Sequence, residues 1–267
     1  MKKLTVVLAG STGLVGKEVL GLLVGDARVS NIVLLNRDPD RALLEAMEFE
    51  PKNNILSESF DLLERAQFGG NIFDSSNSSP ELVTSSNNDL AETKRSIEML
   101  ASESPLRTNN EILNEQFSNY LNSAKSATQS IWVICCIGTT IKKAASKEAF
   151  EEVDRHLVVK LGRWAKAVGA VGMTVVSSLG ADPGSMFFYS RVKGHMEKDL
   201  ESLGLNHLHF IRPSLLLGER KESRPAEYLS QKILRRLPFL FVGKLKAYAP
   251  IAAQDVAQQV VQTLLVR

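Results

Sequence analysis

Short apolar runs alternate along the chain with longer amphipathic stretches. The runs have the length of strands, and the stretches between them repeat their apolar positions with the spacing of a helix. Strands are predicted over residues 3–9, 31–35, 55–60, 131–137, 173–177 and 207–211, and helices from the first glycine loop through Leu23 and over 41–48, 147–168 and 189–203. This alternation predicts an α/β protein whose doubly wound parallel sheet is covered by helices on both faces.

A glycine-rich turn joins the first predicted strand to the first predicted helix. It reads Gly10-Ser11-Thr12-Gly13-Leu14-Val15-Gly16. Gly10 suits the tight turn, Gly13 lets the backbone approach a pyrophosphate, and Gly16 allows the helix to pack closely on the strand. Free amides at the start of a helix favour a phosphate. Because a strand and a helix flank the turn, we interpret it as a nucleotide-binding loop rather than a plain tight turn.

The second predicted strand ends in Asn36-Arg37-Asp38. An NAD-binding fold often presents an acidic residue to the ribose at this point, whereas Asn36 does not repel a 2′-phosphate and Arg37 can pair with one. Asp38 precedes Pro39, which is the form of a helix N-cap followed by proline in the first turn. The segment therefore predicts NADP (NADPH) as the cofactor, with Arg37 as a contact.

Tyr189 and Lys193 lie four residues apart on a predicted helix, after the paired serines Ser177-Ser178 at the end of a predicted strand. Side chains at i and i+4 share one helix face, and a nearby cation stabilises a phenolate over a phenol. Such a pair can transfer a proton to or from a carbonyl or alcohol oxygen. We predict Tyr189 as the acid or base, Lys193 as its cation, and Ser178 rather than Ser177 as the hydroxyl that binds the substrate oxygen.

Composition limits the classes of function. The chain has 267 residues and a net charge of +2, as expected of a soluble globular protein with no general affinity for nucleic acid. No apolar run approaches membrane-spanning length, so no stable membrane association is expected. Cys135 and Cys136 lie in a predicted strand and are interpreted as buried thiols, not as a disulfide or a metal site. The first residues carry no tripartite signal, which predicts a cytoplasmic protein.

Two stretches depart from the alternation. Residues 68–129 are rich in Ser and Asn, and we predict a partly helical or disordered insertion within a single domain that spans 1–267. Residues 232–248 mix basic and apolar positions around Pro238 and Gly243. We predict that this carboxyl-terminal segment covers the substrate side, with a membrane-surface patch as the alternative. A homo-oligomer or a protein partner stays open.

Six short blocks, in this order along the chain, carry a resemblance to a known family. They are Gly10–Gly16, Cys135–Thr140, Val153-Asp154, Ser177–Asp182, Tyr189 with Lys193-Gly194, and Arg212–Gly218. With these blocks the chain resembles the atypical short-chain dehydrogenases/reductases of the Tat-interacting oxidoreductase type, within the Rossmann superfamily. The resemblance covers essentially the whole chain outside the Ser/Asn-rich insertion.

The resemblance implies NADPH as the cofactor and a set of residues that contact it. Those residues are Thr12, Gly13, Leu14, Val15, Arg37, Ile137, Tyr189, Lys193, Leu216 and Arg224. Gly10 and Gly16 in the glycine loop, and Gly138 after the fourth predicted strand, complete the predicted cofactor site.

Two classes of function follow. The first is an NADP-dependent oxidoreductase acting on a small carbonyl or alcohol, with a nucleotide-sugar epimerase-like enzyme as its close relative. The second is a regulatory protein that senses NADPH and catalyses little. The presence of a serine, a tyrosine and a lysine suited to proton transfer favours the first class. The identity of the small-molecule substrate and the direction of the reaction stay open.

Overall fold

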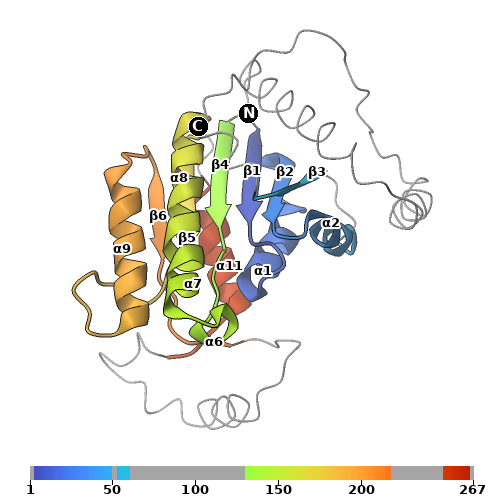
Figure 1. Cartoon of the computed structure of the whole chain (residues 1–267). Helices are drawn as coiled ribbons and strands as arrows, with labels where there is room; N and C mark the ends of the chain where they lie inside the picture. The colour runs from blue at the N-terminus through green and yellow to red at the C-terminus, as the bar shows by residue number, and fades with distance from the viewer. Residues whose placement is uncertain (1–2, 50–52, 61–129, 218–248, 265–267) are drawn as a thin grey trace, which may run out of the picture.

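The computed structural model describes residues 3–49, 53–60, 130–217 and 249–264. These residues build a six-stranded parallel sheet in the order β3-β2-β1-β4-β5-β6 (Figure 1). The strands are β1 (Leu4–Ala9), β2 (Val29–Asn36), β3 (Asn54–Ser59), β4 (Ser130–Cys135), β5 (Gly172–Val176) and β6 (Leu208–Ile211). This order is that of a doubly wound, dinucleotide-binding fold, which confirms the predicted fold class. Every predicted strand is present, with ends displaced by one or two residues.

Helices cover both faces of this sheet and define two layers of core (Figure 1). On one face, α8 (Leu157–Ala167) and α9 (Phe188–Ser202) bury Leu161, Trp164 and Leu200 against the strands. On the other face, α1 (Leu14–Leu23) and α11 (Ala253–Gln262) pack together and bury apolar side chains that include Leu20 and Val256. Since both faces are covered, the central strands are mostly apolar, and all six residues of β1 are buried.

The second helix shows how local sequence sets an element's start. α2 (Pro39–Met47) begins after Asp38, whose carboxylate accepts a hydrogen bond from the Arg41 amide at 3.0 Å. Pro39 occupies the first turn, where its missing N–H is no loss. The predicted cap is therefore confirmed. In the last helix, α11 (Ala253–Gln262), the N-cap is Ala252 and Asp255 lies in the first turn, where a negative charge favours the helix start.

The long helix predicted over 147–168 is not one uniform α-helix. It consists of α7 (Lys147–Glu151), a π-helical turn η1 (Glu152–His156) and α8. The Leu157 amide bonds to the Glu152 carbonyl five residues earlier, which is the spacing of a π-helix. Apolar periodicity does not reveal this turn, because one wider turn rotates the following face without ending the helix. The turn places Asp154 in the interior.

The remaining described elements lie around the carboxyl ends of the strands. The short helix α6 (Ile141–Ala144) follows β4, and β7 (Leu216–Leu217) pairs with β8 (Ile251–Ala252) in a separate two-stranded sheet. Residues 68–129 and 232–248, for which an insertion and a pocket cover are predicted, lie outside the described residues. Among the helices that the structure describes, none has both the length and the apolar character needed to cross a bilayer.

Candidate cofactor and catalytic site

The glycine loop after β1 fits its neighbours so closely that side chains are excluded. Gly10 has a φ of +84°, and a Cβ there would lie 3.0 Å from the carbonyl of Cys136. A Cβ on Gly16 would lie 2.0 Å from the Gly10 carbonyl oxygen. The two glycines therefore hold the turn against the end of β4 and the helix against the turn. Gly13 is the N-cap of α1, and no side chain caps this helix start.

The loop after β4 lies beside the glycine loop, at the point where the strand order reverses. The Cys136 amide donates to the Ala9 carbonyl at 2.8 Å, and the Gly10 amide donates to Leu35 of β2 at 3.0 Å. Ile137 is buried, whereas Gly138 is exposed. Ligands of open α/β sheets bind at such a switch point, outside the carboxyl ends of the strands. The structure therefore brings the predicted loops Gly10–Gly16 and Ile137-Gly138 together.

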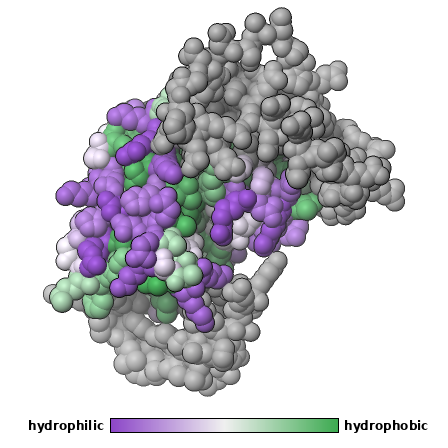
Figure 2. Space-filling model, in the orientation of Figure 1, coloured by the Kyte–Doolittle hydropathy of each residue, from purple (hydrophilic) through white to green (hydrophobic). Residues whose placement is uncertain are grey.

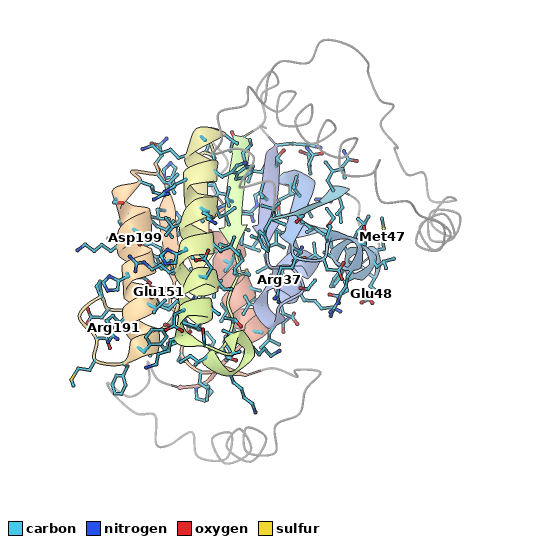
Figure 3. All side chains as sticks on the ribbon, in the orientation of Figure 1. Arg37, Met47, Glu48, Glu151, Arg191 and Asp199 are labelled. Carbon is cyan, nitrogen blue, oxygen red and sulfur yellow. The ribbon has the colours of Figure 1, made fainter. Side chains whose placement is uncertain are left out.

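Three consecutive residues at the end of β2 have three different surroundings. Asn36 is buried and donates through Nδ2 to Ser11 Oγ of the glycine loop at 3.0 Å. Asp38 is engaged in capping α2. Arg37 is exposed at this edge of the sheet (Figure 3). Because the Asp38 carboxylate caps α2, the Arg37 guanidinium stays available to bind an anion.

The paired serines both lie past the end of β5. The side chains of Ser177 and Ser178 are 5% and 8% exposed, and neither hydroxyl has a hydrogen-bond partner among the described residues. Their backbones are held, because the Ser177 amide donates to Ile211 and the Ala181 amide donates to Ser178. A buried hydroxyl without a partner is costly unless a ligand satisfies it. Both serines remain candidates, and the predicted role of Ser178 stays a prediction.

Tyr189 and Lys193 occupy the first two turns of α9, as their spacing predicts. Tyr189 is 40% exposed and its ring lies 5.6 Å from that of the buried Phe150. Lys193 is 3% exposed. The phenol therefore reaches the surface of the site, while the lysine lies in the interior below it.

Asp154 is the charged partner of this lysine. Its Oδ1 lies 2.8 Å from Lys193 Nζ, and its Oδ2 accepts a hydrogen bond from the Thr139 amide at 2.8 Å. Burial by itself lowers the pKa of Lys193, but the Asp154 carboxylate, with Tyr189 and Cys135 nearby, holds this pKa above its ordinary value. The lysine is therefore a charged ammonium at neutral pH.

The role of Asp154 was missed at the level of the sequence. It sits between Phe150 and Val158, one turn away in each direction, and both of these side chains are fully buried. A buried carboxylate needs a cation as partner. An acidic residue at an apolar position of the helical repeat is therefore the feature of the sequence that points to Asp154.

The loop that joins the serines to the tyrosine packs directly on α9. The Asp182 amide donates to the Ser190 carbonyl at 3.1 Å. A Cβ on Gly194 would lie 2.2 Å from the backbone of Asp182 and Pro183. This contact fixes the position of the serine end of the loop relative to the helix that carries Tyr189.

Most of the predicted site residues meet at one edge of the sheet. Beside those above, Thr12 is exposed, Leu14 is half-buried, Val15 is buried in the first turn of α1, and Leu216 lies in β7 after the end of β6. Arg224 lies outside the described residues.

No group of His, Cys, Asp or Glu suited to a metal ion occurs in the described part of the chain.

The surface next to this edge is apolar. Figure 2 shows hydrophobic surface at the lower end of the visible face, whereas the rest of that face is largely hydrophilic. Large apolar side chains exposed around the carboxyl ends of the strands are Ile141, Met186, Phe187 and Leu215. Exposed apolar side chains gathered beside unpaired polar groups are typical of a small-molecule site.

These residues fit a nicotinamide dinucleotide. An uncapped helix start at Gly13 offers amides to a phosphate, and the close glycine contacts leave the backbone bare where a pyrophosphate approaches. Arg37 is exposed for a further anion, and the orphaned serine hydroxyls and Tyr189 lie beyond it toward β5. The sheet order and these loops place the chain among the Rossmann-type α/β proteins.

Comparison with curated proteins gives partial matches. No family model matches the chain. Tat-interacting protein 2, named Protein HTATIP2, of Rattus norvegicus is 44% identical over 104 residues, which is 39% of this chain and 43% of the rat protein. Protein FMP52, mitochondrial, of Candida albicans is 37% identical over 131 residues, 49% of this chain and 56% of its own. The chain spans about half the length of the curated relatives it matches. The predicted resemblance is confirmed.

Solved structures confirm the fold over nearly the whole chain. The reductase domain of PhqB from Penicillium fellutanum matches with a TM-score of 0.52 and 15% identity, over 99% of this chain and 65% of that one. A 3-oxoacyl-[acyl-carrier protein] reductase from Brucella melitensis, in complex with NAD, matches with a TM-score of 0.54 and 10% identity, over 98% of this chain and 90% of that one. At such identities the likeness shows a shared Rossmann fold.

The predicted cytoplasmic location is wrong. The fungal relatives from Candida albicans and Aspergillus fumigatus are both named mitochondrial proteins. The prediction relied on the charge and hydropathy of the first residues. Those residues include β1, a buried strand of the sheet, so their apolar composition reflects the core and gives no information on the location of the protein in the cell.

Proposed function

We propose that this chain is an NADP-dependent oxidoreductase of the short-chain dehydrogenase/reductase type that interconverts a small carbonyl compound and its alcohol. The observation that carries the proposal is that the polar groups suited to this chemistry lie together at one edge of the sheet. Two buried hydroxyls that lack a partner within the described ranges, an exposed phenol and a buried ammonium lie at the edge of the sheet where the glycine loop offers a phosphate site. The named relatives and the reductase fold support it.

Each residue group has a role in this proposal. The glycine loop, Arg37 and the loop Ile137-Gly138 hold the cofactor, which when bound supplies a hydride to the carbonyl carbon. Ser178 donates a hydrogen bond to the carbonyl oxygen and so positions it. Tyr189 gives its phenolic proton to that oxygen as the π pair of the carbonyl moves onto it, and it takes the proton back in the reverse direction. Lys193 stabilises the phenolate that remains.

The test is a comparison of wild type with Tyr189→Phe. The variant keeps the ring beside Phe150 and loses only the hydroxyl, so NADPH affinity should fall by no more than about tenfold, the worth of one hydrogen bond. Turnover of carbonyl substrates found in a broad screen should fall by about 10²- to 10⁴-fold, the usual share of general acid–base catalysis. A matched control is Phe188→Leu, which alters the neighbouring ring and retains the phenol.

Two other outcomes have clear meanings. Equal turnover in wild type and Tyr189→Phe would remove the tyrosine from the mechanism. NADPH binding by a wild-type protein that reduces nothing in the screen would favour the NADPH-sensing alternative over the enzyme.

A further inference from the structure

We propose that Asp154 is a positioning residue of this oxidoreductase site, where its carboxylate holds the Lys193 ammonium in place and ties it to the backbone of the loop after β4. The inference rests on the proposed function and adds to it a residue that the serine, tyrosine and lysine set does not contain. Asp154 would act through Lys193 and the Thr139 amide, without touching the substrate.

The geometry of the pair supports this role. A lysine side chain has four rotatable bonds, so its ammonium needs a fixed partner to stay at one point. Asp154 Oδ1 supplies that partner at 2.8 Å, and the second oxygen of the same carboxylate is fixed by the Thr139 amide, also at 2.8 Å. Both side chains are almost completely buried, with 3% and 1% exposed. One carboxylate therefore connects the lysine to the strand-end loop in which Ile137 and Gly138 are predicted to contact the cofactor.

The helical turn that contains Asp154 directs this residue into the interior. The residue lies in η1, the π-helical turn, and such turns often occur at functional sites. The adjacent Arg155 is half-buried and pairs with Glu151 at 2.6 Å and with Asp199 of α9 at 2.8 Å. Asp154 and Lys193 thus lie on two helices that a second ion pair, between Arg155 and Asp199, also joins.

Charge makes the inference testable. The titratable groups that face Lys193 in the described chain are Asp154 from η1, Tyr189 from its own helix and Cys135 from β4. Of these, Asp154 forms the ion pair with the Lys193 ammonium. Without it, burial would favour the neutral amine, and the site would lose both its cation and a donor for the cofactor as pH rises.

The experiment compares Asp154→Asn and Glu152→Gln with wild type from pH 6 to about 11.5, because the wild-type lysine, with a pKa above 10.5, loses its proton only at the top of this range. Glu152 lies in the same turn but its side chain is 61% exposed, so its variant controls for removal of an acid from η1. Two quantities are measured: the NADPH dissociation constant and the kcat/KM of the best carbonyl substrate. In Asp154→Asn the alkaline loss of both should move to lower pH by at least about one unit, while Glu152→Gln should follow wild type.

A direct titration keeps the inference falsifiable if Asp154→Asn does not fold. Wild-type protein labelled at lysine Cε is titrated by NMR without cofactor, with Lys193→Arg to assign the signal. Lys193 should hold its proton above the ordinary lysine pKa of 10.5. A Lys193 pKa at or below 10.5 would overturn the inference.

The two proposals fail in different ways. A folded Asp154→Asn protein with the wild-type pH profile rejects the positioning role while the oxidoreductase stands. A wild-type protein that binds neither NADPH nor NADH rejects the proposed function, and the NMR titration still reports whether Asp154 holds the charge on Lys193.

Discussion

Arg37 shows how neighbouring side chains leave one residue for a ligand. Asn36 turns inward to Ser11, and Asp38 turns to the Arg41 amide at the start of α2. Asp38 is thereby occupied as a helix cap, and the arginine remains exposed. A guanidinium presents a planar fork of donors that matches a phosphate in two places at once. This arrangement supports the proposed preference for NADP over NAD.

The prediction for Arg37→Ala concerns the difference between two cofactors. Loss of a charged hydrogen-bonded contact should weaken NADPH binding by about 10- to 100-fold, while NADH, which has no 2′-phosphate, should bind as before. Dissociation constants for both cofactors are measured by fluorescence titration. Arg41→Ala serves as control, because Arg41 is an exposed arginine of α2 that pairs with Glu45. Equal NADPH and NADH affinities in wild type and in Arg37→Ala would refute the preference.

At the level of elements, α9 carries the chemistry and the preceding loop is pressed against it. Gly194 follows Lys193 directly, and its missing side chain lets Asp182 and Pro183 approach the helix backbone. Glycine in a helix interior costs about 1 kcal/mol relative to alanine, so its presence here reflects the contact and not the helix. The position of the serines relative to Tyr189 depends on this contact.

The prediction for Gly194→Ala follows from backbone atoms that cannot move aside. The new Cβ would lie 2.2 Å from Asp182 and Pro183, so the free energy of unfolding should fall by at least about 2 kcal/mol and turnover should fall with it. Gly162→Ala in α8 is the control. Its Cβ would meet the side-chain ends of Leu200 and Leu203, which can rotate, and the loss should stay within about 1 kcal/mol. Urea unfolding measures both, and equal losses would contradict the argument.

The elements also show where sequence patterns succeed and where they stop. The helix around Tyr189 and Lys193, the cap at Asp38 and the strand before the glycine loop were all predicted, because each depends on residues a few positions apart. The π-helical turn was not predicted. This turn places Asp154 against the Thr139 amide in the loop after β4 and against Lys193 of α9, and those partners are distant in the sequence.

Across the whole molecule, folding buries the Cys135 thiol of β4 and the ion pair between Asp154 and Lys193. Burial raises the pKa of Cys135 from an ordinary 9.0 to about 11, and it raises the pKa of Cys136 as well. In the unfolded chain these thiols ionise near pH 9, whereas in the fold they keep their protons. The unfolded state therefore binds fewer protons above pH 9, and the free energy of unfolding falls as pH rises. Lys193, whose folded pKa is also raised, adds a further loss above pH 10.5.

The pH prediction is tested with Cys135→Ala. Between pH 9 and about 11 this variant should lose less unfolding free energy than wild type, by on the order of 2 kcal/mol, because one thiol no longer titrates. Val133→Ala is the control, since it also truncates a fully buried side chain of β4 and should lower stability equally at every pH. Urea titrations from pH 8 to 11 give the slopes. Parallel curves for Cys135→Ala and wild type would show that folding does not raise the pKa of the Cys135 thiol.

The sequence by itself determined the features that act over short distances along the chain. These are the alternation of strands and helices, the glycine loop at the start of α1, and the four-residue spacing of Tyr189 and Lys193. Hydrogen bonding and apolar periodicity operate between near neighbours, so a single sequence displays them. The glycine loop, Arg37, the paired serines, Tyr189 and Lys193 follow from such local patterns, whereas Ile137, Leu216 and Arg224 are implied by the family resemblance.

Only the tertiary structure decided which distant groups meet. It placed the end of β4 against Gly10, left the hydroxyls of Ser177 and Ser178 buried without a partner among the described residues, and joined Asp154 to Lys193. Such contacts depend on strand order and on the rotation of helices over the sheet. Because packing sets these relations among segments far apart in the chain, no local pattern records them.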